Sequence, residues 1–187
     1  MSSPAASTAP ISNALRRFRG NRRGSAAVEF ALVAPVFFAL LFAIIETATM
    51  FFASQVLETI TQDSARVIQT GQAQNASYTQ AQFQNYVCSQ IPALFDCTKV
   101  YVDVESYPSS FPVALSTQID ATGNFINNMQ YNPGIACSIV VVRLFYQWPL
   151  FVTGLGYNIS NLAGNQRLLA ATAAFRNEPF SSGACPT

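Results

Sequence analysis

The chain has 187 residues, a length that fits one domain or one domain with an appended segment. Half of the residues are hydrophobic and 10% are charged, whereas about 25% are charged in ordinary soluble domains. This composition argues against a disordered chain and indicates a membrane-associated or secreted protein. The sequence contains no histidine, which excludes Ser-His and Cys-His nucleophile pairs and histidine-ligated metals.

The charges are divided unevenly at residue 24. Half of the ten basic residues precede it, and no acidic residue does. These are Arg16, Arg17, Arg19, Arg22 and Arg23. From Ser25 onward, five basic and nine acidic residues give a net charge of −4. A basic segment can bind nucleic acid or anionic lipid, but membrane topology explains this one better, and we expect no nucleic-acid partner.

An apolar run follows the basic segment. Residues 30–45 carry no charge, and residues 47–53 extend the apolar character beyond Glu46. A hydrocarbon core of ~30 Å requires about 20 helical residues, so the run predicts a tilted transmembrane helix from Phe30 to about Ala53. A secretory signal is the alternative, but its apolar region is usually roughly 7–15 residues long. The preceding arginines predict a cytoplasmic N-terminus and an exported C-terminal part.

Two residues within the predicted span allow more than one interpretation. Glu46 follows Glu29 by 17 residues, which corresponds to about 25 Å along a helix. It lies either at the far membrane interface or, if the helix is buried to Ala53, against a partner helix. Pro35 removes a backbone hydrogen bond and predicts a kink, although a membrane helix can also tolerate a proline in its first turns.

The helical pattern continues beyond the span. Apolar residues from Ser54 to Thr70 keep a helical spacing, so we expect the membrane helix to extend into water and to end at Gly71. Ser77 followed by Gln80 resembles a capping box and predicts a second helix from about Ser77 to Ile91. One face of this helix would carry Phe83, Tyr86, Val87 and Ile91.

The apolar period then changes to that of a strand. Three valines alternate with other residues in the order Val100, Tyr101, Val102, Asp103, Val104 and Glu105. This alternation predicts a half-buried strand whose two acids lie on a solvated face rather than in a catalytic pair. The following residues, 107–112, are rich in proline and serine and predict a loop.

Two later segments complete the predicted domain. Residues from Ser138 to Trp148 are almost continuously apolar, as in a strand covered on both faces. The segment from Leu168 to Arg176 is ambiguous, because its alanines favour a helix while its apolar residues also alternate. Three strands with a helix packed on one face would form a small α+β domain with an antiparallel sheet.

Four cysteines lie in the part of the chain that we expect to be exported, namely Cys88, Cys97, Cys137 and Cys185. An even number in an oxidising compartment predicts two disulfides. A Cys₄ zinc site usually needs closely spaced cysteine pairs, and these spacings are wider, so we predict no metal and no cofactor. Three pairings are possible; we favour Cys88 with Cys97 and Cys137 with Cys185, with free buried thiols as the alternative.

The junction between the basic and apolar segments carries the most information about function. A glycine, Gly24, follows the arginines, and Glu29 stands five positions later at the start of the apolar helix. This spacing resembles the type IV prepilin processing site, where a membrane peptidase cuts after the glycine on the cytoplasmic side. The predicted processing site therefore comprises Gly24, Ser25 and Glu29.

More broadly, the chain resembles the TadE-like pseudopilins of tight adherence (Tad, or Flp) pilus systems. The stretches that carry this resemblance are residues 24–46, 63–71 and 173–180. The middle of the chain, residues 72–137, matches only in general character. The resemblance implies a leader of residues 1–24, a mature protein that starts at Ser25, and a role in pilus assembly. It also implies that Leu168–Arg176 is a strand.

A cut after Gly24 would change the charge of the helix N-terminus. It would remove all five arginines and leave a new amine at Ser25 close to Glu29. A carboxylate that enters a bilayer is costly unless it is paired, and in pilins this pairing links neighbouring subunits. The resemblance thus implies subunit contacts at Glu29, Phe30, Pro35 and Glu46. The alternative is that Glu29 only marks the membrane interface.

Together these features predict three segments: a cytoplasmic leader (1–24), a transmembrane helix with its soluble extension (25–71), and a periplasmic α+β domain with disulfides (72–187). The predicted function is that of a non-enzymatic minor pilin or pseudopilin of a Tad-type (type IVb) pilus. Its partners would be a prepilin peptidase, other pilin-like subunits, the inner-membrane assembly platform and the lipid bilayer. The alternatives are an uncleaved membrane scaffold, an adhesive pilus-tip component and, least supported, an anchored periplasmic enzyme.

Overall fold

The computed structural model describes residues 24–91, 93–107, 115–152, 157–180 and 185. The arginine cluster and most of the loop expected at 107–112 lie outside the described residues. The chain separates into two compact units, residues 1–43 and 44–187. In the first unit, the described residues form only the N-terminal part of one long helix.

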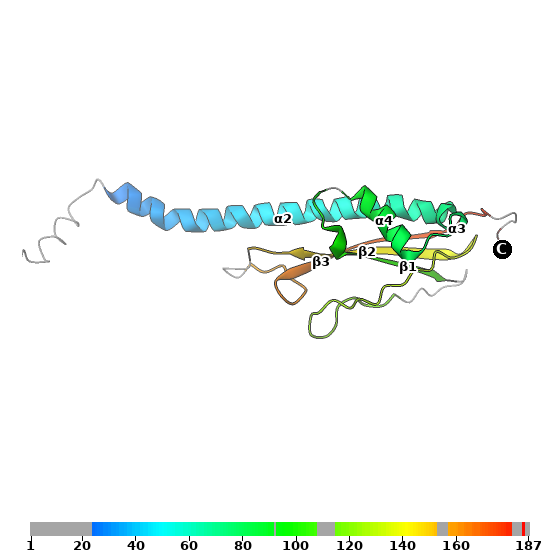
Figure 1. Cartoon of the computed structure of the whole chain (residues 1–187). Coiled ribbons are helices and arrows are strands. Elements are labelled where there is room, and N and C mark those ends of the chain that lie inside the picture. The colour runs from blue at the N-terminus through cyan, green and yellow to red at the C-terminus, as the bar shows by residue number, and fades with distance from the viewer. Residues whose placement is uncertain (1–23, 92, 108–114, 153–156, 181–184, 186–187) are drawn as a thin grey trace, which may run out of the picture. The chain divides into compact units, whose positions relative to one another are not determined.

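This long helix, α2, extends from Ser25 to Gln69, and Pro35 lies inside it without dividing it into two helices (Figure 1). The apolar run and the helical pattern after it therefore form one element, as predicted. The helix is followed by Gly71, which adopts a left-handed backbone with φ of 77°. A Cβ atom there would lie 2.3 Å from the Phe180 side chain, so both conformation and space require glycine.

The second predicted helix is present but begins later than expected. A short helix, α3 (Gln72–Asn75), comes first, and α4 extends from Gln80 to Gln90. The predicted capping box of Ser77 and Gln80 is wrong, because the box is formed by Thr79 and Gln82. The same sequence motif occurs twice here, two residues apart, and the turn that ends α3 at Ser77 leaves only the later copy able to start a helix.

Three antiparallel strands form the sheet in the order β1-β2-β3. They are β1 (Val100–Tyr107), β2 (Ile139–Pro149) and β3 (Gln166–Arg176). The ambiguous segment is therefore a strand, as the family resemblance implied. Its register pairs Leu144 of β2 with Ala171 of β3. The α+β architecture predicted from the sequence is confirmed.

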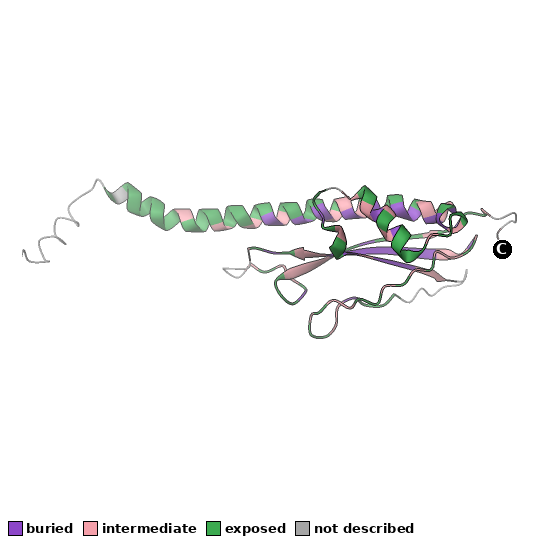
Figure 2. Ribbon diagram, in the orientation of Figure 1, coloured by how far each residue is buried: buried purple, intermediate pink, exposed green. Residues whose placement is uncertain are grey.

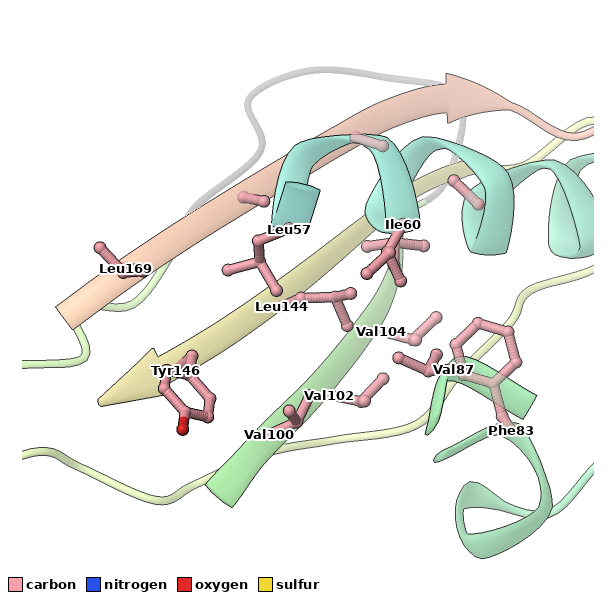
Figure 3. Close-up of a cluster of buried hydrophobic side chains, with 14 of the residues drawn as sticks. Leu57, Ile60, Phe83, Val87, Val100, Val102, Val104, Leu144, Tyr146 and Leu169 are labelled. Atoms are coloured by element: carbon pink, nitrogen blue, oxygen red, sulfur yellow. The ribbon is translucent and has the colours of Figure 1, made fainter. Parts of the chain in front are cut away.

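The hydrophobic core lies between one face of this sheet and the helices α4 and α2, the latter from residue 44 onward (Figures 1 and 3). Leu57 and Ile60 of α2 and Phe83 and Val87 of α4 are buried there. The sheet contributes Val100, Val102, Val104, Leu144, Tyr146 and Leu169, which are labelled in Figure 3. Of the face predicted for the second helix, Phe83 and Val87 are buried and the other two residues are half-buried.

The opposite face of β1 and β2 is covered by the irregular segment 115–132. The ring centroid of Phe125 lies 4.6 Å from that of Tyr101 and 6.1 Å from that of Phe145. The end of the segment pairs with the outer edge of β1, where Tyr131 forms a parallel bridge with Val104. Because helices cover one face and this segment covers the other, β2 is buried almost continuously. The prediction of a strand covered on both sides is confirmed.

Candidate functional site

The N-terminal part of α2 is an apolar surface with no cover in the described structure. None of the residues from Ala26 to Ile45 is buried (Figure 2). The most exposed large side chains include Phe30, Leu32, Val33, Leu40 and Ile44, each at least 60% exposed. With Phe38, Phe42 and Ile45, which are also exposed, these side chains face all sides of the helix rather than one stripe. This is the pattern of a helix surrounded by lipid or by other helices. Among the described residues, α2 is the one helix that is long and apolar enough to cross a membrane.

The residues of the predicted processing site stand at the start of this helix. Gly24 directly precedes α2, Ser25 is its first residue, and the side chain of Glu29 is exposed. Phe30 and Pro35 are also exposed. These residues thus follow one another along the start of one helix, and the side chains of Glu29, Phe30 and Pro35 are exposed. The processing and subunit-contact roles remain predictions.

Glu46 is the first buried residue of α2 and contacts the chain's own C-terminal unit. Its side chain is only 7% exposed. One carboxylate oxygen accepts a hydrogen bond from the backbone N–H of Phe151, and both oxygens accept from the N–H of Val152, at 3.1 Å each. Next to it, the hydroxyls of Thr47 and Tyr157 are hydrogen-bonded. These contacts join the first turn of this unit to the loop between β2 and β3.

The sequence alone did not predict this contact, because the groups that the carboxylate binds are backbone amides of its own chain. Whether Glu46 also lies at the far membrane interface stays a prediction. Its position does have a signal in the sequence. Buried positions on α2 follow a spacing of three and four residues, namely Glu46, Met50, Ala53, Leu57, Ile60, Ser64 and Ile68. Extending the stripe of the soluble half backward reaches Glu46, so this periodicity predicts that the side chain faces the sheet. Its assembly role stays a prediction.

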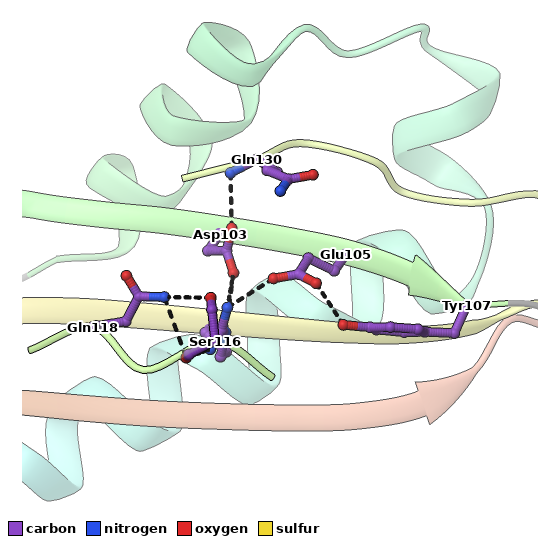
Figure 4. Close-up of polar contacts among 7 residues, drawn as sticks. Asp103, Glu105, Tyr107, Ser116, Gln118 and Gln130 are labelled. Carbon is purple, nitrogen blue, oxygen red and sulfur yellow. Dashed lines mark hydrogen bonds and ion pairs between the residues drawn. The ribbon is translucent and has the colours of Figure 1, made fainter. Parts of the chain in front are cut away.

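A buried ion pair on the other face of the sheet corrects a second expectation (Figure 4). Asp103 is 1% exposed and does not lie on a solvated face. Its Oδ2 accepts hydrogen bonds from Nη2 and Nε of Arg143 at 2.6 and 2.9 Å, and its Oδ1 accepts one from the Gln130 N–H at 2.7 Å. Arg143 also binds Glu105, at 2.7 Å, and donates to the carbonyl of Ser116.

The reason for this error is the cover that segment 115–132 provides. Alternation shows that Asp103 and Glu105 share a face but not that another segment lies over it. A single arginine inside the apolar β2 sequence was the available signal, because a charge in a buried strand requires a partner. The Glu105 side chain also accepts a hydrogen bond from Tyr107, and burial together with this bond raises the pKa of Tyr107 to about 12. The cluster ties the covering segment to the sheet.

Two disulfides lie in the C-terminal unit, and each joins a residue shortly before a strand to another segment. Cys88 of α4 pairs with Cys97, just before β1, and Cys137, just before β2, pairs with Cys185. The Cα atoms of the two pairs lie 5.7 and 5.4 Å apart. These are the pairs favoured from the sequence, and such bridges are characteristic of proteins that fold in an oxidising compartment.

Comparison with known proteins agrees with the resemblance seen in the sequence. The family model described as "TadE-like protein" matches residues 24–66. The match begins at Gly24 and covers most of α2, whereas the sheet lies outside it. No curated protein and no solved structure gives a significant match. An apolar helix that can span a membrane once, within this match, fits a component of a Tad pilus. The segment from residue 24 to residue 66 is therefore TadE-like.

Proposed function

We propose that this protein is a minor pilin or pseudopilin of a Tad-type pilus, made with a leader that a prepilin peptidase removes after Gly24. The carrying observation is the TadE-like match, which starts at the predicted cleavage glycine and continues along an apolar helix with no buried residue before Glu46. The protein acts by assembly rather than by catalysis. Its N-terminus faces the cytoplasm, and residues beyond the span lie in the periplasm, consistent with the arginine cluster and the disulfides.

Cleavage prepares the helix for packing among other subunits. The five arginines that hold the N-terminus at the cytoplasmic face leave with the leader. What remains is a helix whose first charges are the Ser25 amine and Glu29. The Glu29 carboxylate is exposed, so it is free to pair with the amine of a neighbouring pilin-like subunit, and the pairing offsets the cost of placing either charge in the bilayer.

The test is the N-terminus of the protein extracted from native membranes, with and without the prepilin peptidase. Intact mass and N-terminal sequencing should give a start at Ser25 that depends on the peptidase, and Gly24→Ala should block it. A Cβ atom at Gly24 meets no atom within 4 Å, so the variant should fold normally. Gly20→Ala, also in the leader, is the matched control and should be processed.

A start at Met1 or Ser2 in cells that contain the peptidase would contradict cleavage. The arginines would then be a permanent topology anchor, and the protein would be an uncleaved membrane scaffold of the pilus machinery. If the protein is cleaved and immunogold labelling finds it only at the fibre tip, the result would favour an adhesive component of the pilus tip.

A further inference from the structure

The end of the C-terminal unit that carries Glu46 has an unusual surface. Three phenylalanines there are strongly exposed: Phe51 (61%) and Phe52 (63%) on α2, and Phe151 (85%) in the loop after β2. They are the exposed phenylalanines among the described residues from 44 onward. Several exposed aromatic side chains at one end of a folded unit commonly mark a binding surface or a membrane contact.

The two segments that carry these phenylalanines have no charge at their surface, although Arg167 pairs with Trp148 and the exposed Asp96–Lys99 ion pair lies just before β1 at this end of the sheet. The sequence has no charged residue between Arg143 and Arg167, and Glu46 is the only one between Glu29 and Glu58. The Glu46 carboxylate points inward, where it accepts hydrogen bonds from the Phe151 and Val152 backbone. The segments on both sides of this contact therefore present apolar and uncharged groups outward, so placing them against lipid carries no cost for an exposed charge.

The length of the apolar helix places this end at the bilayer. Ala26 to Ile45 is a stretch of 20 residues with no buried side chain, and about 20 helical residues cross a hydrocarbon core of ~30 Å. If this unburied stretch, rather than the Phe30–Ala53 span expected from the apolar run alone, is the part of α2 that crosses the membrane, Glu46 lies where the helix leaves the hydrocarbon. The loop that binds Glu46, and the two phenylalanines one to two turns further on, then lie at the boundary between acyl chains and headgroups, where aromatic side chains are favoured.

We propose that Phe51, Phe52 and Phe151 form a membrane-docking rim that seats the C-terminal unit on the lipid surface at the point where α2 emerges. This inference rests on the proposed function, because it requires α2 to cross the membrane. The buried Glu46 carboxylate has a defined role in the rim. By accepting hydrogen bonds from two backbone amides, it holds the loop that carries Phe151 against the helix.

The test uses the full chain in vesicles of phosphatidylcholine and phosphatidylglycerol, with a single tryptophan as the probe. The only tryptophan is Trp148, which is half-buried, and Trp148→Phe keeps an aromatic ring at this place. Phe151→Trp in that background puts the probe on the rim. We expect lipids brominated on their acyl chains to quench it strongly and the aqueous quencher acrylamide to reach it poorly.

Two further probes make the result decisive. Ile135→Trp is the matched control, since Ile135 is 78% exposed and precedes the opposite end of β2, an 11-residue strand about 35 Å long. We expect several-fold weaker lipid quenching there. Phe42→Trp reports the span itself. Lipid quenching at position 42 without quenching at position 151 would overturn the docking rim and leave the membrane span intact. Absence of quenching at both positions would overturn the span and the rim together.

Discussion

The two halves of α2 show how one continuous helix serves two different surroundings. From Ala26 to Ile45 no residue is buried and the apolar side chains face every direction. From Glu46 to Ile68 the helix has a buried stripe with a spacing of three and four residues, packed on the sheet, and beyond Ala53 its exposed residues are polar. Helix formation is the same in both halves, so the difference lies in the distribution of apolar residues around the axis.

The change occurs within one turn, at Glu46. Before it, only lipid or other helices can cover the apolar surface; after it, the protein's own sheet does so. Between Glu46 and Ala53 the helix has both a side covered by the sheet and an uncovered apolar side. Met50 and Ala53 are buried there, while Phe51 and Phe52 are exposed. The comparison therefore makes a prediction about substitutions: the same change should affect folding in one half and membrane assembly in the other.

The largest expected effect on folding is a cavity under the buried stripe. Leu57 is fully buried, so Leu57→Ala should lower the free energy of unfolding by about 2–5 kcal/mol. Denaturant unfolding of the detergent-solubilised protein, followed by near-ultraviolet circular dichroism, measures this. Leu40→Ala is the matched control, since Leu40 is 62% exposed and its loss should change the value by less than about 0.5 kcal/mol. Equal losses would refute the division of the helix.

A charge placed in the exposed half of α2 should impair membrane insertion and leave the folding of the C-terminal unit unchanged. Leu40→Asp places a carboxylate near the middle of the predicted span, which costs about 2.5–3.5 kcal/mol of membrane insertion. We expect a large fall in the share of protein that resists carbonate extraction from membranes, with the unfolding of the C-terminal unit unchanged. If Leu40→Asp integrates as well as the native chain, this half of α2 does not lie in the bilayer.

A smaller loss of stability is expected at the boundary between the halves. Glu46→Gln keeps one side-chain oxygen as an acceptor but loses the charge and part of the hydrogen bonding to Phe151 and Val152, so it should cost about 1–3 kcal/mol. Glu58→Gln, on the same helix, should stay within about 0.5 kcal/mol. Thermal unfolding of the two variants measures the difference. Equal melting temperatures would show that the Glu46 contact does not stabilise the unit.

The smallest expected effect is the loss of stability in acid. It should arise in the C-terminal unit, because residues 30–45 contain no group that titrates. Hydrogen bonds from the Asn124 backbone and the Thr122 side chain lower the pKa of Asp120 from 3.8 to about 2. The folded state therefore favours the carboxylate, and this stabilisation is present above about pH 4 and lost as the pH falls to 2. The advantage in melting temperature of the native chain over Asp120→Asn should thus shrink between pH 5 and pH 2.

A matched variant controls for the general effect of acid on charge. Asp63→Asn removes another exposed carboxylate, on α2, so a pH-dependent change that both variants share reflects the loss of charge alone. An unchanged difference between the native chain and Asp120→Asn across this range would show that the hydrogen-bonded loop at Asp120 does not contribute to stability.

The sequence by itself determined the elements whose pattern is local. The uncharged run predicted the exposed half of α2, and the spacing of apolar residues predicted its soluble continuation. Alternating valines predicted β1, and the continuous apolar run predicted a β2 covered on both faces. For β3, propensity and periodicity disagreed, and only the expectation drawn from the family resemblance favoured the strand that the structure has. Even the preferred disulfide pairs agree with the structure.

Tertiary structure decided which faces are covered and by what. Asp103 shares its strand face with other alternating residues, yet it is buried because segment 115–132, which has no periodic pattern, folds over it and Arg143 lies opposite on β2. The partners of Glu46 are two backbone amides of the loop at Phe151, more than a hundred residues later, and no local pattern predicts them. Periodicity reports only that residues share a face, whereas burial depends on contacts between segments far apart in the chain.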